Sequence, residues 1–426
     1  METNDPQQQQ SIGQLARIKV AGVGGAGGNA IQYMIAAGLR HVDFVAMNTD
    51  AQALTRVPSA RHVHLGERIT RGLGAGGDPA MGARAAEESA EIIAATLAGA
   101  DLVFVTLGLG GGTGTGAGPI VARIARKQGA LVVGVVTLPF GFEGRKRAAS
   151  AWRGLLAMRE QVDTLVTIPN DRLFGATAAN VTLLDAFRVA DDVLRQAVGG
   201  LTDLVTVPGL INLDFADLRA VMAGAGTALM SVGEADGPKR ASVAAHLALT
   251  NPLLGLEVQG AQGIVFNVTG GSDMTLAEVQ LVAEIIGNAG HPDATMIFGA
   301  VNDDAYAGRL RVTVVATGFA AALTALTPPK GLLASPPAPA MADPTPSVTR
   351  TPTTPLPEMP LTATQPPPVP ATTPGRYWEP APTPAAPVRA ISPPQPDLVP
   401  SGASATRDAR NQSTSALPAY LRRHWK

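Results

Sequence analysis

Short runs of Val, Ile and Leu, each followed by a helical pattern, constrain the fold of this chain more than any other feature. Such runs occupy residues 18–23, 42–47, 102–107, 131–136 and 164–168. The helical patterns between them include residues 29–37, 79–97 and about 117–127. Apolar runs without polar alternation are typical of strands buried on both faces, as in a parallel sheet covered by helices. The sequence therefore predicts an α/β fold, and parallel sheets of this kind bind ligands at the carboxyl ends of their strands.

A long helix is predicted next, over residues 182–205, and Pro208 ends it. Apolar residues recur there at the three- and four-residue spacing of one helical face: Leu183, Phe187, Ala190, Leu194, Ala197 and Leu201. A smaller α/β unit follows. Its predicted helices are 214–223, 241–248 and 275–286, and its predicted strands are 263–268, 294–299 and 310–316.

Proline divides the chain into a globular body and a tail. Of the 35 prolines, 25 lie between Pro328 and Pro418, in a stretch that is otherwise Ala, Thr and Ser. Such a composition buries too little apolar surface to offset the entropy of ordering the chain. The expected organisation is a disordered segment 1–12, a first domain 13–181, a central helix 182–206, a second α/β domain 207–320, a disordered linker 321–412 and a terminal segment 413–426.

Charge and cysteine usage exclude several functions. The net charge is −1 and cysteine is absent, so thiolate metal sites, disulfides and cysteine nucleophiles are ruled out. A near-neutral chain lacks the positive electrostatic potential that attracts nucleic acid. Residues 1–10 lack the apolar core of a signal peptide, and no apolar run is long enough for a membrane span. We expect a cytoplasmic protein that does not bind nucleic acid.

Three glycine-rich stretches carry the first functional signal. Residues 22–28 and 108–116 each lie between a predicted strand and a predicted helix, and residues 72–77 form a third loop. Backbone N–H groups at a helix start can hold phosphate. In the first stretch, a tight turn alone would also explain the glycines. Two such loops at one sheet edge suggest a polyphosphate, although the lysine loop GxxxxGK[ST] is absent.

Two further segments offer contacts for a nucleoside. Glu143 can accept from a ribose hydroxyl and Arg147 can approach phosphate, although a solvated basic helix start explains the same residues. Phe187 and Asp191 lie one turn apart on the long helix, where one can stack on a base and the other can accept from N–H groups. On pattern alone, Phe187 is expected in the core.

An acidic pair opens the first helix of the second domain. Asp214 and Asp217 are three residues apart and share one helical face. Helix capping explains them, and so does a role in positioning water and a cation for phosphoanhydride hydrolysis. We expect this loop to lie on the far side of the long helix from the glycine loops, within reach only of a neighbouring subunit's phosphates.

From residue 18 to about residue 318, the chain resembles the FtsZ family of tubulin-like GTPases of bacterial cell division. The resemblance rests on the signature at 110–116 and on the motifs at 48–52, 71–76, 168–171 and 212–217, which stand in family order. It implies GTP/GDP binding in the first domain, Mg²⁺ held mainly through the phosphates without a protein metal site, and a head-to-tail homopolymer that forms a division ring at the septum.

The family's site residues map onto this sequence one by one. The resemblance implies phosphate and nucleotide contacts at Gly24, Gly25, Ala26, Asn29, Asn48, Gly74, Ala75, Gly76, Gly111, Gly112, Thr113, Gly114, Thr115 and Gly116. It implies ribose and phosphate contacts at Glu143 and Arg147, and guanine contacts at Asn170, Phe187 and Asp191. It implies a catalytic loop at Asn212, Asp214 and Asp217 that enters the next subunit's nucleotide site.

The final residues resemble the family's partner-binding peptide. The residues concerned are Leu417, Pro418, Tyr420, Leu421 and Arg422. Leu417, Tyr420 and Leu421 would share one face of a short helix, which suits a hydrophobic groove. The resemblance implies docking to membrane tethers and division regulators such as FtsA, and a location at the division site on the inner face of the membrane.

The chain also departs from the family pattern at several positions. Leu138 stands where Lys is common, and Gly118 stands where Ala is common. Leu107 and Leu109 replace the smaller residue and the Met that usually flank the signature. None of these departures removes a residue named above as a ligand.

Two other functions remain open on the residues alone. An NAD-dependent oxidoreductase would use Gly22, Gly24 and Gly27 for the pyrophosphate and Asp50 for the ribose. The second glycine loop and the scarcity of histidine argue against it. A scaffold that binds nucleotide without hydrolysing it is the third possibility, and the intact acidic pair argues against that one. Binding assays with GTP and NAD, and a phosphate-release assay, separate the three.

Overall fold

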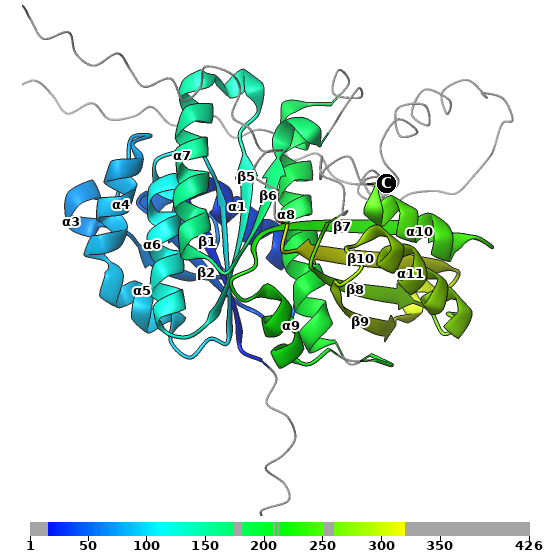
Figure 1. Cartoon of the computed structure of the whole chain (residues 1–426). Helices are drawn as coiled ribbons and strands as arrows, with labels where there is room; N and C mark the ends of the chain where they lie inside the picture. Colours follow the sequence, from blue (N-terminus) through cyan, green and yellow to red (C-terminus); the bar gives the residue numbers. More distant parts are fainter. Residues whose placement is uncertain (1–15, 174–180, 208, 212, 251–259, 320–426) are drawn as a thin grey trace, which may run out of the picture. The chain divides into compact units, whose positions relative to one another are not determined.

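The computed structural model describes residues 16–173, 181–207, 209–211, 213–250 and 260–319, and all of them belong to one compact unit. The predicted linker, the terminal peptide and Asn212 lie outside the described residues. Figure 1 shows the helices and strands of this unit and labels most of them.

The described strands form one ten-stranded sheet in the order β3-β2-β1-β4-β5-β6-β7-β10-β8-β9. The strands are β1 Ile18–Val23, β2 Asp43–Asn48, β3 Arg61–His64, β4 Leu102–Gly108, β5 Leu131–Leu138, β6 Thr164–Pro169, β7 Gly226–Asp236, β8 Gly263–Gly270, β9 Thr295–Asn302 and β10 Arg309–Thr317. From β3 through β6 to β7 all neighbours are parallel, which confirms the predicted parallel sheet. β10 runs antiparallel to both β7 and β8, and β9 is parallel to β8.

Helices cover both faces of the parallel part of the sheet. The helices are α1 Gly24–Ala36, α2 Ala51–Thr55, α3 Glu67–Thr70, α4 Pro79–Glu88, α5 Ala90–Leu97, α6 Thr113–Lys127, α7 Arg145–Gln161, α8 Leu183–Thr206, α9 Phe215–Met222, α10 Arg240–Leu249 and α11 Leu276–Ala289. Alternate residues of β4 enter different cores. Leu102 and Phe104 pack with α1 and α8, whereas Val103 and Val105 pack with α4–α7. This two-sided burial is the reason that the strand reads as an uninterrupted apolar run.

A third core lies in the part of the unit built from β7–β10. Ala244 and Ala248 of α10 and Val282 and Ile286 of α11 pack there on apolar side chains of the sheet such as Phe266. This mixed part of the sheet, with α10 and α11 packed on it, corresponds to the smaller α/β unit that the sequence predicts. The fold class is therefore confirmed for the residues that the structure describes.

The sequence pattern does not predict β7, which joins the two parts of the sheet. Its first residues, Gly226–Ala228, pair in parallel with Thr164–Val166 of β6, and its later residues pair with β10. Gly, Ser and Glu interrupt the apolar residues of β7, so neither a buried run nor a strict alternation marks it. Only the partners on both sides identify this segment as a strand.

Two predicted helices differ from those observed in ways that bear on the site. The sequence predicts helices from about Asn29 and Ala117, but α1 begins at Gly24 and α6 at Thr113. The glycine stretches therefore supply the first turns of these helices. Because glycine has a low helix propensity, the sequence pattern does not predict these turns. The helix predicted over 79–97 is broken at Ser89, whose hydroxyl accepts from the N–H of Gly66.

Candidate nucleotide site

The loops that follow β1, β4, β5 and β6 lie at one edge of the sheet. The register pairs the last residue of β1, Val23, with Leu107, and Leu107 with Val136. It then pairs Thr137 of β5 with Ile168 near the end of β6. Because these strands are parallel neighbours, the two glycine loops and the segments after β5 and β6 share the carboxyl edge.

The first glycine loop contains glycines that close packing requires and one glycine that borders open space. Gly24 has φ +75°, and a Cβ there would lie 2.8 Å from the backbone N of Gly114, so the turn requires glycine at this position. A Cβ on Gly27 would lie 2.5 Å from the carbonyl oxygen of Thr106. Gly25, by contrast, is exposed and has open space at its Cβ position. The exposed residues of this turn are Gly25, Ala26 and Asn29.

The second glycine loop shows the same division. A Cβ on Gly112 would lie 2.9 Å from both the Ala75 Cβ and the Asp78 backbone N, and one on Gly114 would lie 2.8 Å from the Gly108 carbonyl oxygen. Gly111 has no atom within 4 Å of its Cβ position. Close packing therefore accounts for most of these glycines, while Gly25 and Gly111 border open space.

The third loop is held against the start of α6. The Gly74 N–H donates to the Thr49 carbonyl oxygen over 3.1 Å. The Thr49 hydroxyl in turn lies 2.7 Å from the Thr113 hydroxyl, in the first turn of α6. Asn48 precedes Thr49 and is buried, and its Oδ1 accepts from the Asp50 N–H. These contacts join the loops after β2, after α3 and after β4.

Thr115 and Gly116 pack against neighbouring segments of the chain. The Thr115 hydroxyl accepts from the Gly110 N–H at 2.8 Å, and its methyl group packs close to Gly154 of α7. Gly116 packs against the backbone of α4 at Pro79, where any side chain would collide. The structure thus gives both residues roles in loop and helix packing, and their assignment to the nucleotide stays a prediction.

Glu143 and Arg147 form an ion pair at the start of α7. Arg147 Nε lies 2.8 Å from Glu143 Oε2, and the other carboxylate oxygen accepts from the Phe140 N–H at 2.8 Å. The Arg147 side chain also packs against Gly110, where a Cβ would lie 2.7 Å from Arg147 Cγ. Both side chains therefore lie beside the second glycine loop in fixed orientations, and Arg147 keeps half of its surface exposed.

An aromatic group forms the next part of this edge. Phe140 stacks on Phe142 with ring centroids 5.1 Å apart, and Phe187 of α8 meets Phe140 edge-on at 5.7 Å. Phe187 is 41% exposed, so the core position expected from the helical pattern alone is wrong. The apolar face of α8 is buried at Leu194 but open at Leu183 and Phe187.

Two polar groups near these rings are set up for hydrogen bonding. Burial raises the pKa of the Asp191 carboxyl to about 7. Asn170, directly after β6, is 5% exposed, and its Oδ1 has no hydrogen-bond partner among the described residues. A buried amide oxygen without a partner is costly, so a ligand donor at this position is consistent with its chemistry.

The acidic pair lies at the opposite edge of the sheet. Asp214 caps α9 and accepts from the Asp217 N–H at 2.7 Å, and both side chains are exposed. Arg219 of α9 donates to the carbonyl oxygen of Gly129, which precedes β5. The hydroxyl of Thr164, the first residue of β6, donates to the Met222 carbonyl oxygen at 2.6 Å. These contacts fix α9 at the amino ends of β5 and β6 (Figure 1).

Comparisons with known proteins identify the family. A profile of the Tubulin/FtsZ family GTPase domain matches residues 17–178, and a profile of the FtsZ family C-terminal domain matches residues 226–320. The structure of an empty FtsZ dimer from M. jannaschii is 45% identical, with a TM-score of 0.69, and the match covers 75% of this chain and 93% of that chain. The chain belongs to the FtsZ family.

Two further solved structures are similar. A tryptophan-to-tyrosine mutant of M. jannaschii FtsZ is 47% identical over 72% of this chain and 92% of that chain, with a TM-score of 0.68. CetZ2 from Haloferax volcanii, solved as a GTPγS-bound protofilament, is 22% identical over 70% of this chain and 92% of that chain. Its TM-score of 0.61 supports a shared fold. FtsZ-family membership makes this chain a GTP-binding, GTP-hydrolysing protein of a cytoskeletal family.

FtsZ-family membership also decides against the oxidoreductase interpretation, and the structure explains its supporting residues differently. Asp50 accepts from the N–H groups of Gln52 and Ala53 and so caps α2. Gly22 and Gly27 pack against each other's backbone. The spacing that resembles a dinucleotide fingerprint is thus the packing pattern of one strand-to-helix turn.

Two departures from the FtsZ pattern are related in space. A Cβ on Gly118 would collide with the δ-methyl group of Leu107, which is fully buried. The larger residue on β4 therefore occupies the volume that a larger residue on α6 would need. Leu109 is likewise buried, 2% exposed. Leu107, Leu109 and Gly118 thus all lie in the core behind the second glycine loop.

In the part of the chain that the structure describes, no helix is long and apolar enough to cross a membrane. The same residues contain no group of three His, Cys, Asp or Glu side chains placed to hold a metal ion.

Proposed function

We propose that this protein hydrolyses GTP within head-to-tail filaments of the division ring, and that the acidic loop of one copy completes the site of the next. The observation that carries the proposal is the separation of the two half-sites. The open glycine positions lie at the carboxyl edge of the sheet, whereas Asp214 and Asp217 lie on α9 at the amino edge. β5 spans eight residues between these edges, or about 25 Å at 3.3 Å per residue.

The carboxyl edge suits the triphosphate. Gly25 and Gly111 border open space at the starts of α1 and α6, where the first turn of each helix carries N–H groups without an intrahelical partner and the positive end of the helix dipole. Arg147, half exposed and oriented by Glu143, can approach a phosphate oxygen. This arrangement supplies the positioning and electrostatic stabilisation that phosphoryl transfer needs. Mg²⁺, bound through the phosphates, would add neutralising charge.

The aromatic group and its polar neighbours suit a guanine base. Phe187 offers an exposed ring face beside Phe140. When ionised, the Asp191 carboxylate can accept from two neighbouring N–H groups of one base edge, and the Asn170 Oδ1 needs a donor. A base with adjacent N–H donors and a flat ring matches all three residues.

A contact between opposite edges of two copies produces a filament. The interface is heterologous, because a pocket on one copy meets an acidic loop on the next, and such interfaces build open chains unless the rotation closes. The related structures described as an FtsZ dimer and a CetZ2 protofilament support self-association of this kind. Asp214 and Asp217 would polarise the attacking water, with Asn212 in the same loop.

The decisive experiment is Asp217→Ala with Glu91→Ala as a matched control, an exposed acid on α5 away from both edges. We expect Asp217→Ala to lower the GTP turnover rate by about 100-fold, because a charged group is removed from the transition state. GTP affinity and filament formation should stay within about twofold of wild type, since the pocket is intact. A parallel loss of GTP affinity would place Asp217 in its own subunit's pocket and overturn the proposal.

Protein concentration gives a second readout on the unmodified chain. A site shared between copies requires turnover per molecule to rise steeply above a threshold concentration, together with light scattering. Turnover per molecule that is constant across the threshold would show that each copy is complete by itself.

The C-terminal peptide is proposed as the docking site for membrane tethers and regulators such as FtsA, at the inner face of the membrane. Deletion of residues 414–426 should leave GTP turnover unchanged, because all pocket and acidic residues remain. It should abolish recruitment to vesicles that carry a tether, measured by co-sedimentation. Undiminished recruitment would contradict the docking role.

A further inference from the structure

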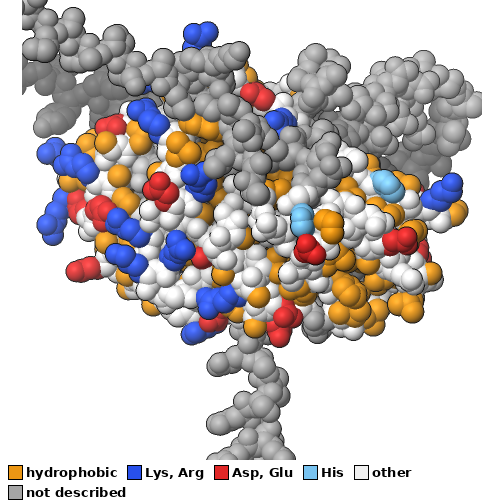
Figure 2. All heavy atoms as spheres, in the orientation of Figure 1, with side chains coloured by type: hydrophobic (Ala, Val, Ile, Leu, Met, Phe, Trp, Pro, Cys, Tyr) orange, Lys and Arg blue, Asp and Glu red, His pale blue; other side chains and the backbone are white. Residues whose placement is uncertain are grey.

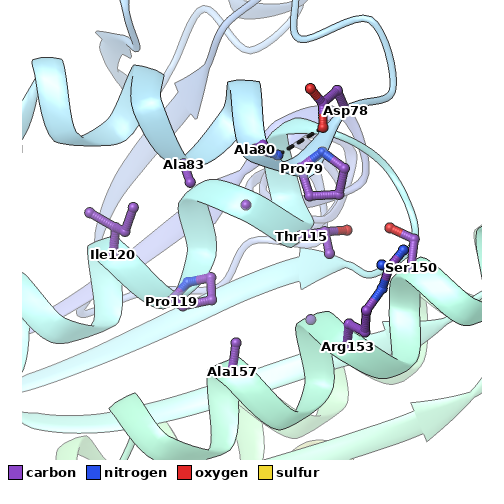
Figure 3. Close-up of a pocket in the computed structure, with 12 residues that line it drawn as sticks. Asp78, Pro79, Ala80, Ala83, Thr115, Pro119, Ile120, Ser150, Arg153 and Ala157 are labelled. Carbon is purple, nitrogen blue, oxygen red and sulfur yellow. Dashed lines mark hydrogen bonds between the residues drawn. The ribbon is translucent and has the colours of Figure 1, made fainter. Parts of the chain in front are cut away.

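A cavity of about 510 Å³ lies between α4, α6 and α7, on the opposite side of α6's first turns from the open glycine positions. Figure 3 shows the residues around it: Asp78 to Ala83 from α4 and its cap, Thr115 to Ile120 from α6, and Ser150 to Ala157 from α7. Thr115 and Gly116 of the predicted nucleotide set line this cavity, whereas none of the guanine or ribose residues proposed above does. Its volume is large enough for a small organic ligand.

Small residues at the helix contacts create the cavity. Gly116 lets α6 approach the backbone of α4, and Gly154 lets α7 approach Thr115. Ala83 and Ala157 are too short to fill the space that remains next to these close contacts. Pro119 and Ile120 contribute apolar surface from α6, so the walls are mainly apolar.

Two hydrogen-bond donors on α7 line the same cavity and have no partner among the described residues. Ser150 is 8% exposed, and its hydroxyl has no hydrogen-bond partner among the described residues. Arg153 is exposed and lies three residues further along α7, so the two side chains are neighbours on the helix surface. Within the described ranges, no carboxylate lies within ion-pairing distance of Arg153.

Two other polar groups belong to the lining. The Asp78 Oδ1 caps α4, accepting from the Ala80 N–H at 2.9 Å, and the Thr115 hydroxyl accepts from the Gly110 N–H. Helices α4 to α7 carry nine Lys and Arg residues against four Glu, and Figure 2 shows basic and acidic side chains interspersed over the part of the surface where Figure 1 places these helices. The surroundings are basic on balance despite the Asp78 carboxylate, and Ser150 and Arg153 are donors, which favours a ligand with anionic acceptor oxygens.

We propose that this cavity binds a small amphipathic anion. Its apolar body packs on Pro119, Ile120 and Ala157, and its acidic group accepts from Ser150 and Arg153. Such a ligand would also contact Thr115, whose hydroxyl holds the backbone of the second glycine loop. The binding itself needs neither GTP nor a second copy of the chain, so it is tested independently of the proposed function.

Two fluorescent probes with the same aromatic body test the proposal. Anilinonaphthalene sulfonate carries an anionic group, and phenylnaphthylamine is its neutral counterpart. Titrations of the full chain should show saturable binding of the sulfonate. Arg153→Gln should weaken sulfonate binding by about tenfold, as expected for loss of a charge-assisted hydrogen bond, while leaving the neutral probe unchanged.

Two more variants locate the binding and control for charge. Ala157→Phe fills the cavity and should weaken both probes, and Lys127→Gln, which removes a cation at the end of α6 outside the cavity, should weaken neither. Circular dichroism melting establishes that each variant folds. If Arg153→Gln, an exposed substitution, binds the sulfonate as tightly as wild type does, the proposal is overturned, whatever the behaviour of Ala157→Phe.

Discussion

The two edges of the parallel sheet use different chemistry. The carboxyl edge presents backbone N–H groups, an oriented arginine and an exposed aromatic ring, and its glycine loops carry no acidic side chain. The amino edge presents two exposed carboxylates on α9. The glycine loops suit a polyanion, whereas the two carboxylates of α9 repel one. Under the proposed function, neither edge is a complete reaction centre, and the length of the parallel strands keeps the two halves of one copy apart.

Alanine substitution of two neighbouring glycines gives the sharpest test within the carboxyl edge. Gly112→Ala should lower the free energy of unfolding by about 1–3 kcal/mol, because the new Cβ meets Ala75 and the Asp78 backbone at 2.9 Å. Gly111→Ala should leave the melting temperature unchanged and weaken GTP binding by about tenfold or more, since the methyl group enters space proposed for a phosphate.

Thermal melting and GTP titration of the two variants check this prediction. Each glycine is the other's control, because they are adjacent and receive the same methyl group. Equal losses of stability in both variants would contradict the division of the loop into packed and open positions.

A change of pH tests the carboxyl edge through Asp191. Its carboxyl must be ionised to accept from a base, and its pKa is about 7 in the folded protein. We expect GTP affinity to fall severalfold between pH 8 and pH 6 in wild type. Asp191→Asn should bind GTP weakly at both values and lose this dependence.

Stability should move in the opposite direction. The folded-state pKa lies above the unfolded value, so the contribution of this group to stability is greatest below pH 4 and is lost as pH rises through 7. Without nucleotide, Asp191→Asn should therefore melt at a higher temperature than wild type at pH 8. A lower melting temperature of the variant at pH 8 would show that the carboxylate is stabilised by a partner instead.

The smallest effect is expected at the amino edge, from Arg219→Ala. This variant loses the hydrogen bond to Gly129 that holds α9 on the sheet, which is worth about 1 kcal/mol. Turnover should fall by about twofold to fivefold because α9 is less well positioned. GTP affinity should not change. Arg84→Ala removes an exposed arginine on α4 and serves as the control. Lower GTP affinity in Arg219→Ala would mean that the two edges communicate within one copy.

Much of the fold and the location of the site follow from local patterns. Uninterrupted runs such as residues 102–107 predict strands buried on both faces, and glycine stretches directly after them predict ligand loops. The acidic pair is visible as Asp214 and Asp217 at the start of a helix. These features depend on residues that are close in sequence, so they can be recognised without knowledge of the tertiary structure.

Other features depend on partners far away in the sequence. β7 is a strand because β6 and β10 flank it, and Phe187 is 41% exposed although Ala186 and Ala190 on the same helix are buried. Likewise, Gly118 and Leu107 fit together only across the interface between β4 and α6. A pattern along the chain does not show which volume in the folded protein is already occupied by side chains distant in sequence.

The sequence by itself determined the α/β class, the glycine loops after the strands and the acids at a helix start, because strand burial, glycine content and helix periodicity are local properties. The tertiary structure alone decided which glycines border open space and that α9 is held at the amino ends of β5 and β6. It also decided that a cavity remains between α4, α6 and α7. The reason is that free volume and separation across a sheet are set by atoms that meet only after folding.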